Sequence, residues 1–435
     1  MEILNIISNS ELRSKIVMLE NTQIHLVFCS LNRIFAPNMA GIYIHIPFCK
    51  SRCIYCGFYS TTSLELRQRY VDALCKEMAI RGRRKEKGGK SNDEEIETIY
   101  LGGGTPSQLS SSQLRQIFDA IYINKVYPKE ITIEVNPDDV TVEFAAVLQQ
   151  LPINRVSMGI QTFNDQRLQF LHRRHTAHQA IEAIKRLRSA GIQNISIDLM
   201  YGFPGETLSD WQSDIGSALA LNVEHISAYC LMIEEGTPLY QLRIKRSSYA
   251  RLLPKGRKNL ELREEFPSEE LERQMYYTLI NRLEAAGYEH YEISNFAKKG
   301  FRSRHNSSYW NGTPYIGLGA AAHSYDIRSR SWNVADINAY IEGIEDGERR
   351  FEEEILDDDT RYNDTITVGL RTKEGIDLSL LTKKHRDYCM KNARRYIDDG
   401  LLELSVVGDA ESPTLHLTRR GLFVSDMVMS DLMMV

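Results

Sequence analysis

The 435-residue sequence lacks two features that would point to a charged or lipid partner: an excess of basic charge and a long apolar run. Its 53 Lys and Arg residues face 58 Asp and Glu residues, for a formal net charge of −5. This balance gives no footprint for nucleic acid or for an anionic membrane, and we expect neither as a partner. The apolar run from Ile24 to Phe28 stops before Asn32 and Arg33. It is too short to span a bilayer, so we expect no membrane span.

Cysteine is also scarce, and its distribution argues against a disulfide framework. The sequence has seven cysteines, an odd number, and four of them are scattered. The first residues lack the basic start of a secretory signal. Both features fit a reducing compartment, and we expect a cytoplasmic protein. The scattered cysteines are Cys29, Cys75, Cys230 and Cys389.

The other three cysteines lie in the stretch around which the chain is organised. An apolar, β-branched run over 42–46 predicts a buried strand that Pro47 ends. Cys49, Cys53 and Cys56 follow in a Cys-x3-Cys-x2-Cys pattern. A [4Fe–4S] cluster usually takes four cysteines, so three thiolates would leave one iron open to another ligand. The alternative is a structural zinc site with His45 or another cysteine as the fourth ligand.

Five further apolar segments predict strands, and amphipathic helices separate most of them. This alternation indicates a parallel α/β sheet with both faces covered. Ligands of such folds bind at the carboxyl ends of the strands. A doubly wound sheet and a partial barrel both fit the pattern. The five segments are Thr98 to Leu101, Ile131 to Val135, Arg155 to Ile160, Ile195 to Met200 and Ile226 to Leu231.

Polar and small residues follow these predicted strands. The glycines at 102–104 and Thr105 form a turn at which backbone can approach a ligand closely, because no Cβ obstructs it. Glu134 ends the third strand, where its carboxylate can accept hydrogen bonds from ribose hydroxyls. The alternative for the glycine run is that it only forms a tight strand-to-helix turn. The alternative for Glu134 is an ordinary surface or salt-bridged glutamate.

The cysteine loop resembles the cluster loop of the radical S-adenosylmethionine (SAM) superfamily. The flanking residues, Tyr43 to Cys49 and Tyr55-Cys-Gly57-Phe58, are similar to those of the anaerobic coproporphyrinogen oxidase family and, within it, of the HemW haem-chaperone group. The resemblance implies an incomplete (β/α)6 barrel over about residues 41–235. It also implies a [4Fe–4S] cluster whose open iron is chelated by SAM, which the reduced cluster cleaves to a 5′-deoxyadenosyl radical.

The same resemblance implies a set of SAM-binding residues. Arg173 would pair with the SAM carboxylate, and Arg174 is the competing assignment. Gln161 and Asp198 would hydrogen-bond the nucleoside, and Glu134 completes the set. Tyr43 would support the site, Gly103, Gly104 and Thr105 would hold the methionine part, and Tyr55, Gly57 and Phe58 would bind cofactor from the cluster loop.

A second motif, His305-Asn-x-x-Tyr309-Trp310, resembles the motif associated with haem binding in the HemW group. It offers an imidazole for iron and flat aromatic surface for a porphyrin. The alternative is a packed, hydrogen-bonded histidine in the core. His323 is a weaker axial candidate, and Cys230 is weaker still.

These features support a haem chaperone that delivers haem to haem-accepting proteins. The alternative is an oxygen-independent coproporphyrinogen III oxidase, an oxidoreductase that decarboxylates propionates. Phe58 favours the chaperone, because the oxidases typically carry a further cysteine there. We expect haem or porphyrin, a reductant such as a flavodoxin or ferredoxin, and a homodimer as partners, and we assign no catalytic residue. A zinc-stabilised α/β protein is the remaining alternative.

The composition beyond the predicted barrel changes twice. A charged stretch over 241–270 predicts a variable surface loop, and the last eighty or so residues predict helices carrying Leu370, Leu380 and Tyr396, a hairpin and a final helix from Arg420. That order resembles a winged helix, without a basic recognition stripe. The expected segments are an N-terminal extension (1–38), the radical SAM core (39–240), the charged loop (241–270), a barrel extension with the haem-type motif (271–355) and the winged-helix-like domain (356–435).

Overall fold

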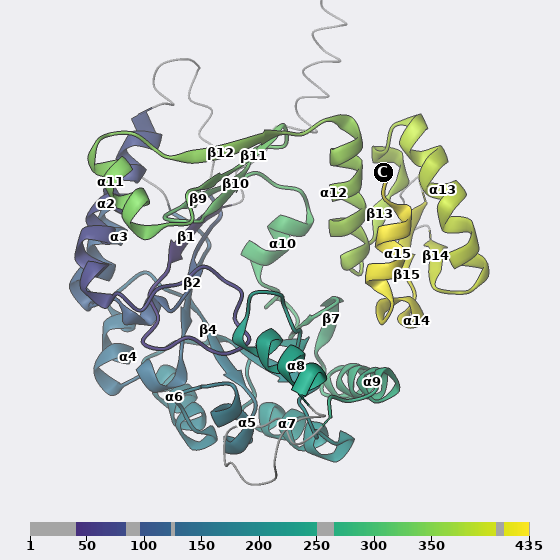
Figure 1. The fold of residues 1–435 in the computed structure, drawn as a ribbon, viewed down its shortest axis with the longest axis horizontal. Helices are drawn as coiled ribbons and strands as arrows, with labels where there is room; N and C mark the ends of the chain where they lie inside the picture. Colours follow the sequence, from purple (N-terminus) through teal and green to yellow (C-terminus); the bar gives the residue numbers. More distant parts are fainter. Residues whose placement is uncertain (1–40, 84–95, 123–126, 250–264, 406–412, 435) are drawn as a thin grey trace, which may run out of the picture. The chain divides into compact units, whose positions relative to one another are not determined.

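The computed structural model describes residues 41–83, 96–122, 127–249, 265–405 and 413–434 (Figure 1). The predicted N-terminal extension, and the hairpin tip between 405 and 413, lie outside these residues. None of the helices in the described part of the chain is long and apolar enough to cross a membrane.

The six predicted strands form the parallel centre of a 12-stranded sheet. Neighbouring strands pair in chain order from β1 to β6, each parallel to the next. The observed bounds lie within two residues of the prediction: β1 (Gly41–Ile46), β2 (Thr98–Gly103), β3 (Glu130–Val135), β4 (Arg155–Gln161), β5 (Asn194–Tyr201) and β6 (His225–Cys230).

Strands from later in the chain extend both edges of this centre. On one side β9 (Tyr315–Leu318) pairs with β1 in parallel, and β10 (His323–Tyr325), β11 (Ser329–Asn333) and β12 (Phe351–Ile355) continue antiparallel. On the other side β8 (Asn295–Ala297) and β7 (Glu289–Glu292) follow β6. The sheet therefore has two different edges, β12 and β7, as an incomplete barrel does.

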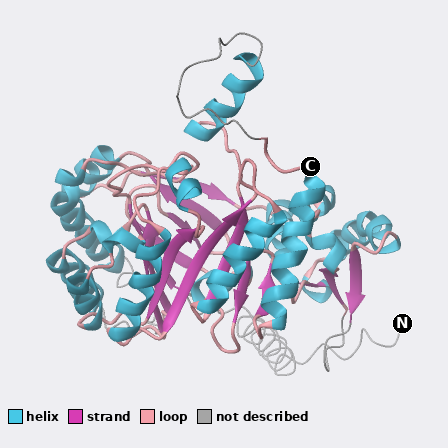
Figure 2. Cartoon of the chain, turned by 90° about the horizontal axis from the view of Figure 1, so that it is seen from below, coloured by secondary structure: helices cyan, strands magenta, loops and turns pink. Residues whose placement is uncertain are grey.

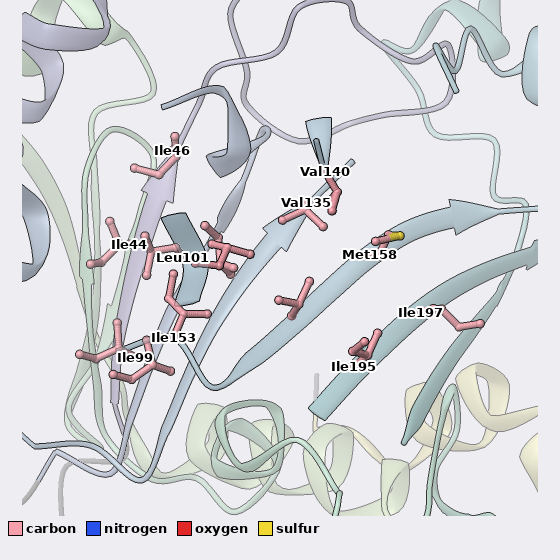
Figure 3. Close-up of a cluster of buried hydrophobic side chains, with 14 of the residues drawn as sticks. Ile44, Ile46, Ile99, Leu101, Val135, Val140, Ile153, Met158, Ile195 and Ile197 are labelled. Carbon is pink, nitrogen blue, oxygen red and sulfur yellow. The ribbon is translucent and has the colours of Figure 1, made fainter. Parts of the chain in front are cut away.

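The two faces of the parallel centre differ in character. Ile44, Ile99 and Ile197 are buried on one side and share a core cluster with the helices (Figure 3). The opposite side carries buried polar residues such as Thr132 and Ser196. Each fully buried isoleucine contributes roughly 1.5–3 kcal/mol relative to exposure, so the apolar side holds the fold and leaves the polar side for a site.

The helices that follow the strands cover the apolar side of the sheet (Figures 1 and 2). Local signals explain their ends: Thr176 and Thr207 make capping boxes, and Gly191 adopts φ +86° directly after the C-cap residue Ala190. The helices are α2 (Arg67–Arg83), α3 (Ser111–Tyr122), α4 (Val142–Gln149), α5 (Asp165–Phe170), α6 (Ala177–Ser189) and α7 (Leu208–Ala220).

The charged stretch after β6 differs from the prediction of a loop. A helix, α8 (Pro238–Tyr249), occupies its first part, and residues 250–264 lie outside the described residues. Leu239 is buried in a small cluster with Ile54 and Phe203, so a few apolar contacts at its start anchor α8 among charged neighbours. The next helix is α9 (Glu269–Ala285), whose N-terminus is capped by the Ser268 side chain.

The C-terminal segment has its own hydrophobic cluster, which includes Tyr362, Leu370 and Tyr396. A small sheet of β13 (Ile376–Asp377), β15 (Thr414–Leu417) and β14 (Leu402–Ser405) contains the predicted hairpin. Leu380 lies in a 3-10 turn (Leu378–Leu380) and not in a full helix as expected. The helices are α12 (Asp358–Arg371), α13 (Lys383–Asp398), α14 (Arg419–Leu422) and α15 (Ser425–Leu432).

Candidate radical SAM site

The cysteine loop closes on itself at the end of β1. A bridge joins Phe48 to Thr61, where the Cys49 N–H donates to the Thr61 carbonyl at 2.9 Å. Ile54, between the second and third cysteines, is 3% exposed and anchors the loop to the barrel. Its N–H donates to the Leu171 carbonyl at 3.3 Å. The loop therefore presents its cysteines from a fixed base.

The three thiols are half-buried and lie at the same edge of the sheet as the strand ends. Cys49 Sγ is 3.5 Å from Thr105 Oγ1, and Arg173 Nη1 is 3.6 Å from Cys53 Sγ. Burial is the main cause that raises the pKa of Cys49 and Cys56, and the neighbouring thiols raise both further. The thiols thus act on one another electrostatically, and a bound metal centre would relieve this by stabilising the thiolates.

The zinc alternative requires a fourth ligand, and His45 does not provide one in this structure. Its Nε2 is 3.0 Å from the Tyr59 carbonyl, and its Nδ1 is 3.1 Å from the Tyr43 hydroxyl. Burial lowers the pKa of His45 to about 4, so the ring is neutral. Within the described ranges, no three His, Cys, Asp or Glu side chains are gathered as a ligand set for one metal ion.

A cavity of about 170 Å³ opens at the carboxyl ends of β2 to β5, next to the cysteine loop. Seven of the predicted SAM-binding residues line it: Phe58, Gly104, Thr105, Glu134, Gln161, Arg173 and Asp198. The sequence interpretation missed four other lining residues, Val135, Asn136, Ser157 and Gly159.

The other predicted residues from the first two strands and the loop lie around this cavity. Tyr43 stacks on Tyr100 with ring centroids 6.2 Å apart and so supports the lining from behind. Tyr55 packs on the small apolar cluster around Ile54. Gly57 lies where a Cβ would come within 2.1 Å of Glu234 Oε2, so a side chain there would displace the Glu234 carboxylate.

The glycine run after β2 is needed first for protein contacts, which the sequence interpretation did not foresee. A Cβ at Gly103, which has φ +107°, would lie 2.4 Å from the His45 ring. A Cβ at Gly104 would lie 2.7 Å from the Pro47 carbonyl carbon, in the backbone that leads into the cysteine loop. The glycines therefore let β2 lie directly against that loop, and Gly104 also faces the cavity.

Glu134 is held in place by two donors from β2. The Tyr100 hydroxyl donates to its Oε1 at 2.7 Å, and the Gly103 N–H donates to its Oε2 at 3.1 Å. Burial raises the pKa of Glu134 to about 7 and that of Asp198 to about 6. Arg155, which is 1% exposed, acts in the opposite direction on both carboxyls. Tyr100 and Arg155 are thus supporting residues that the sequence pattern did not reveal.

The two adjacent arginines have different surroundings, which favours one of the competing assignments. The Arg173 guanidinium lines the cavity and donates to the Asn136 side-chain oxygen at 2.7 Å and the Gly159 carbonyl at 2.5 Å. Its Nε is buried without a hydrogen-bond partner among the described residues. Arg174 instead makes ion pairs with Asp138 and Asp139 at 2.8 and 3.3 Å. Only Arg173 is therefore placed to bind a carboxylate in the cavity.

The end of β4 carries an irregularity at the cavity wall. The pairing with β5 shifts register between Gly159 and Gln161, and Gln161 has φ +71°. A non-glycine residue in this region is uncommon and marks local strain, which is often found at ligand sites. A Cβ at Gly159 would lie 2.7 Å from Gln161 Nε2 and 3.2 Å from Arg173 Nη2, so a glycine is needed where these side chains meet.

The histidine motif lies on α10 (Arg304–Trp310), at the opposite, amino ends of β1 to β3. His305 is 1% exposed, and both of its ring nitrogens are engaged. Nδ1 is 2.7 Å from Thr98 Oγ1, and Nε2 is 2.8 Å from the Tyr309 hydroxyl. Burial lowers the pKa of His305 to about 3. In this conformation His305 is a packed, hydrogen-bonded core histidine, which is the alternative to a haem ligand. Neither of its ring nitrogens is open to iron.

A buried carboxylate completes the attachment of α10. Glu130, the first residue of β3, accepts hydrogen bonds from the backbone N–H groups of Arg304 and His305 at 3.0 and 3.1 Å. A carboxylate is favourable at a helix N-terminus, because the first N–H groups have no partner within the helix. The His305 ring also stacks on Tyr100, with centroids 5.1 Å apart. The motif is thereby connected to Glu134 through Tyr100.

The two weaker axial candidates also have distinct positions. His323 is exposed at the start of β10 and stacks on Trp332 with centroids 5.6 Å apart. Cys230 ends β6, and a Cβ on Gly202 would lie 2.9 Å from its Sγ. Burial raises the pKa of the Cys230 thiol to about 12, so the thiol stays protonated at neutral pH.

The site fits an iron–sulfur cluster and SAM on its own geometry. Three cysteines lie on one anchored loop, and a guanidinium whose buried Nε has no hydrogen-bond partner among the described residues faces the adjoining cavity. The cavity also carries two carboxyl groups suited to sugar hydroxyls and amines. Cys49, Cys53 and Cys56 would hold the cluster, and Arg173, Glu134 and Asp198 would position SAM.

Comparison with known proteins defines the class first. Residues 43–217 match the model of the radical SAM superfamily, so the fold is that of a radical SAM protein. The structure is also similar to coproporphyrinogen III oxidase (HemN) from Escherichia coli, with a TM-score of 0.71 over 91% of this chain and 90% of that chain. Sequence identity in that pair is 20%, so the likeness shows the shared fold.

Curated relatives then define the family. The haem chaperone HemW of Bacillus subtilis is 34% identical over 391 residues, which cover 88% of this chain and 96% of the relative. The haem chaperone HemW of Lactococcus lactis is 32% identical over 88% of this chain and 94% of that protein. The chain belongs to the HemW family, and the cofactors of its superfamily are SAM and a [4Fe–4S] cluster.

Proposed function

We propose that this protein is a radical SAM haem chaperone, which binds haem and delivers it to haem-accepting proteins. The observation that carries the proposal is the relationship to HemW proteins along nearly the whole length of both chains. Phe58, which lines the cavity where the oxidases typically carry a further cysteine, supports the chaperone over the oxidase.

The residues of the site have separable tasks in this function. When bound, the cluster supplies an electron to SAM, and a flavodoxin or ferredoxin is the kind of reductant we expect. Arg173 neutralises and orients the SAM carboxylate, while Glu134 and Asp198 hold hydroxyl and amino groups. Burial of the Glu134 and Asp198 carboxyl groups strengthens each charge-assisted hydrogen bond that they make. The cytoplasmic location and the homodimer stay predictions.

The test is a comparison of binding, transfer and turnover with anaerobically prepared full-length protein. We expect iron and sulfide at about four each per chain, a Soret band that shifts on addition of haem, and transfer of that haem to an apo-haem protein. We expect no decarboxylated product from coproporphyrinogen III with SAM and a reductant. Turnover of coproporphyrinogen III without haem binding would overturn the chaperone proposal in favour of the oxidase.

A further inference from the structure

The small apolar cluster around Ile54 belongs neither to the core of the sheet nor to the cluster of the C-terminal segment. We call it the loop cluster, because its members come from segments at or after the carboxyl ends of the strands. Each buried member is at most 6% exposed. These members are Ile54, Leu171, Met200, Phe203, Leu231 and Leu239, and partly buried residues such as Tyr55 and Phe266 pack against them.

The loop cluster connects three segments that carry cofactor-binding candidates. Ile54 lies between the second and third cysteines of the cysteine loop, and its N–H donates to the Leu171 carbonyl at 3.3 Å. Leu171 comes two residues before Arg173, and Met200 comes two residues after Asp198. The segments with the thiols, the cavity guanidinium and one cavity carboxyl group therefore share one apolar contact region.

One side of the loop cluster is fixed by the barrel itself. The Glu206 carboxylate accepts hydrogen bonds from the N–H groups of Gly202 and Phe203 at 2.7 and 3.1 Å. The Arg167 guanidinium lies 5.8 Å from the centroid of the Phe203 ring and 3.5 Å from Glu206 Oε1. Phe203 is fully buried, so this wall of the cluster has a set position.

The other side is closed by the first turn of α8. Leu239 is fully buried in the loop cluster, and its N–H donates to the Ile54 carbonyl at 2.9 Å. The turn has its own cap, since Thr237 Oγ1 accepts from the Tyr240 N–H at 3.2 Å and donates to the Glu234 carbonyl at 2.6 Å. Leu239 thus gives α8 both an apolar contact and a backbone hydrogen bond to the cysteine loop.

The chain before α9 returns to the same place. The Gly205 N–H donates to the Glu265 carbonyl at 2.9 Å, and Phe266 packs against the loop cluster. The Arg243 guanidinium, on α8, lies 5.9 Å from the centroid of the Phe266 ring. The described residues on both sides of 250–264 are therefore attached at the carboxyl ends of the strands.

The cysteine loop depends on this attachment, because it has little buried surface of its own. Ile54 is the single buried residue from Lys50 to Ser60. Both of its backbone groups are bonded outside the loop, the N–H to Leu171 and the carbonyl to Leu239. Metal ligands bind well only when surrounding residues hold them in the binding geometry. Leu171 and Leu239 provide that support for the three thiols.

We propose that Leu239 is a positioning residue for the radical SAM site. Through Ile54 it fixes the cysteine loop, and through the loop cluster it couples that loop to the segment of Arg173. Retention of the iron–sulfur cluster and binding of SAM then both depend on the attachment of α8. The proposal rests on the cofactors of the proposed function and not on delivery of haem.

The first test measures the cysteine loop without any cofactor. Leu239→Ala leaves a cavity beside Ile54, so Cys53 and Cys56 of the apo-protein should react several-fold faster with iodoacetamide, followed by mass spectrometry. Leu239→Val should give an intermediate rate, and Leu239→Ile, which keeps the volume, should restore the wild-type rate. Gln241→Ala, at an exposed position of the same helix, is the matched control and should react as the wild type does.

Cys75, which lies on α2, is the internal reference, and its rate should stay constant in every variant. Wild-type rates at Cys53 and Cys56 in Leu239→Ala, or a uniform rise that includes Cys75, would overturn the positioning role.

The second test uses protein with a reconstituted cluster. Leu239→Ala should lose iron to a chelator several-fold faster than the wild type and bind SAM about tenfold more weakly. Wild-type values of both in Leu239→Ala would overturn the proposal. The proposed function fails by a different result: a wild type that holds its cluster and SAM but binds no haem would refute the chaperone and leave Leu239 as a positioning residue.

Discussion

The two ends of the parallel strands in this protein are built for opposite purposes. At the carboxyl ends, a loop of half-buried thiols adjoins a cavity in which a buried guanidinium Nε has no hydrogen-bond partner in the part of the chain that the structure describes. At the amino ends, α10 closes the interior, and both nitrogens of His305 are hydrogen-bonded. Residues of α/β barrels follow the same division: ligand-binding groups at the carboxyl face, stabilising groups at the amino face.

This difference shows that the position of a histidine motif, at the carboxyl or the amino ends of the strands, has to be known before the motif is assigned to ligand binding. An imidazole can serve iron only if a nitrogen is free or weakly held, and His305 makes bonds of 2.7 and 2.8 Å. Its contact with Tyr100, which holds Glu134, gives it an indirect part in the SAM site. The following variants test the contrast, in order of decreasing effect.

Loss of a cluster cysteine should have the largest effect, because it removes a ligand at the open end. We expect Cys53→Ser to lower iron and sulfide from about four each per chain towards zero, measured by metal and labile-sulfide analysis. Cys75→Ser is the control, since Cys75 lies on α2 with its Sγ 3.7 Å from the Gln116 carbonyl. Full iron content in Cys53→Ser would contradict the assignment of the three thiols.

Removing the imidazole at the closed end should affect stability more than cofactor content. His305→Ala leaves a cavity and removes the hydrogen bonds that the imidazole makes with Thr98 and Tyr309, so we expect the free energy of unfolding to fall by about 4 kcal/mol. Denaturant unfolding measures the change, and iron content should stay near the wild-type value. The exposed His178, replaced by Ala, should change stability little; an equal loss in both variants would refute the difference between the ends.

Glu134 joins the two ends, and its raised pKa predicts how stability depends on pH. The folded pKa of about 7 lies above the ordinary value, so the folded protein keeps a proton that the unfolded chain releases. The free energy of unfolding should therefore fall by about 3 kcal/mol as pH rises from about 4.5 to 7.

Glu134→Gln removes that titration, so the difference in unfolding free energy between wild type and variant should change across this range. Asp198→Asn should show the same sign with a change that is complete nearer pH 6, because the pKa of Asp198 is raised to about 6. Identical pH profiles of wild type and Glu134→Gln, measured by urea unfolding, would contradict the raised pKa.

The smallest of these effects separates the adjacent arginines within the open end. Arg173→Ala should weaken SAM binding by about 30-fold, which corresponds to about 2 kcal/mol for a lost charge-assisted hydrogen bond. Arg174→Ala should change SAM affinity by less than about threefold, because its ion pairs are with Asp138 and Asp139. Anaerobic calorimetry of both variants is the measurement, and the reverse ranking would select Arg174.

The sequence predicted best those site residues whose role can be recognised from their near neighbours in the chain. The thiols are close together in the chain, the strand-end rule pointed to Glu134, and the family resemblance pointed to Gln161 and Asp198; all three of these residues line one cavity. Arg155 and Tyr100 were missed, because each acts on a carboxyl group that a different strand carries. The helix α8 was missed for a related reason: a few buried contacts such as that of Leu239 hold a segment whose own pattern is charged.

Sequence alone determined that three thiols follow the first strand and that alternating strands and helices build a parallel sheet, because both depend on short-range spacing. The tertiary structure decided which arginine enters the cavity, which end of the strands α10 closes and that His305 has no free nitrogen. It also brought Ile54 and Leu239 to one apolar cluster from separate elements. Such choices depend on distances between segments far apart in the chain, and burial and hydrogen bonding between those segments set these distances.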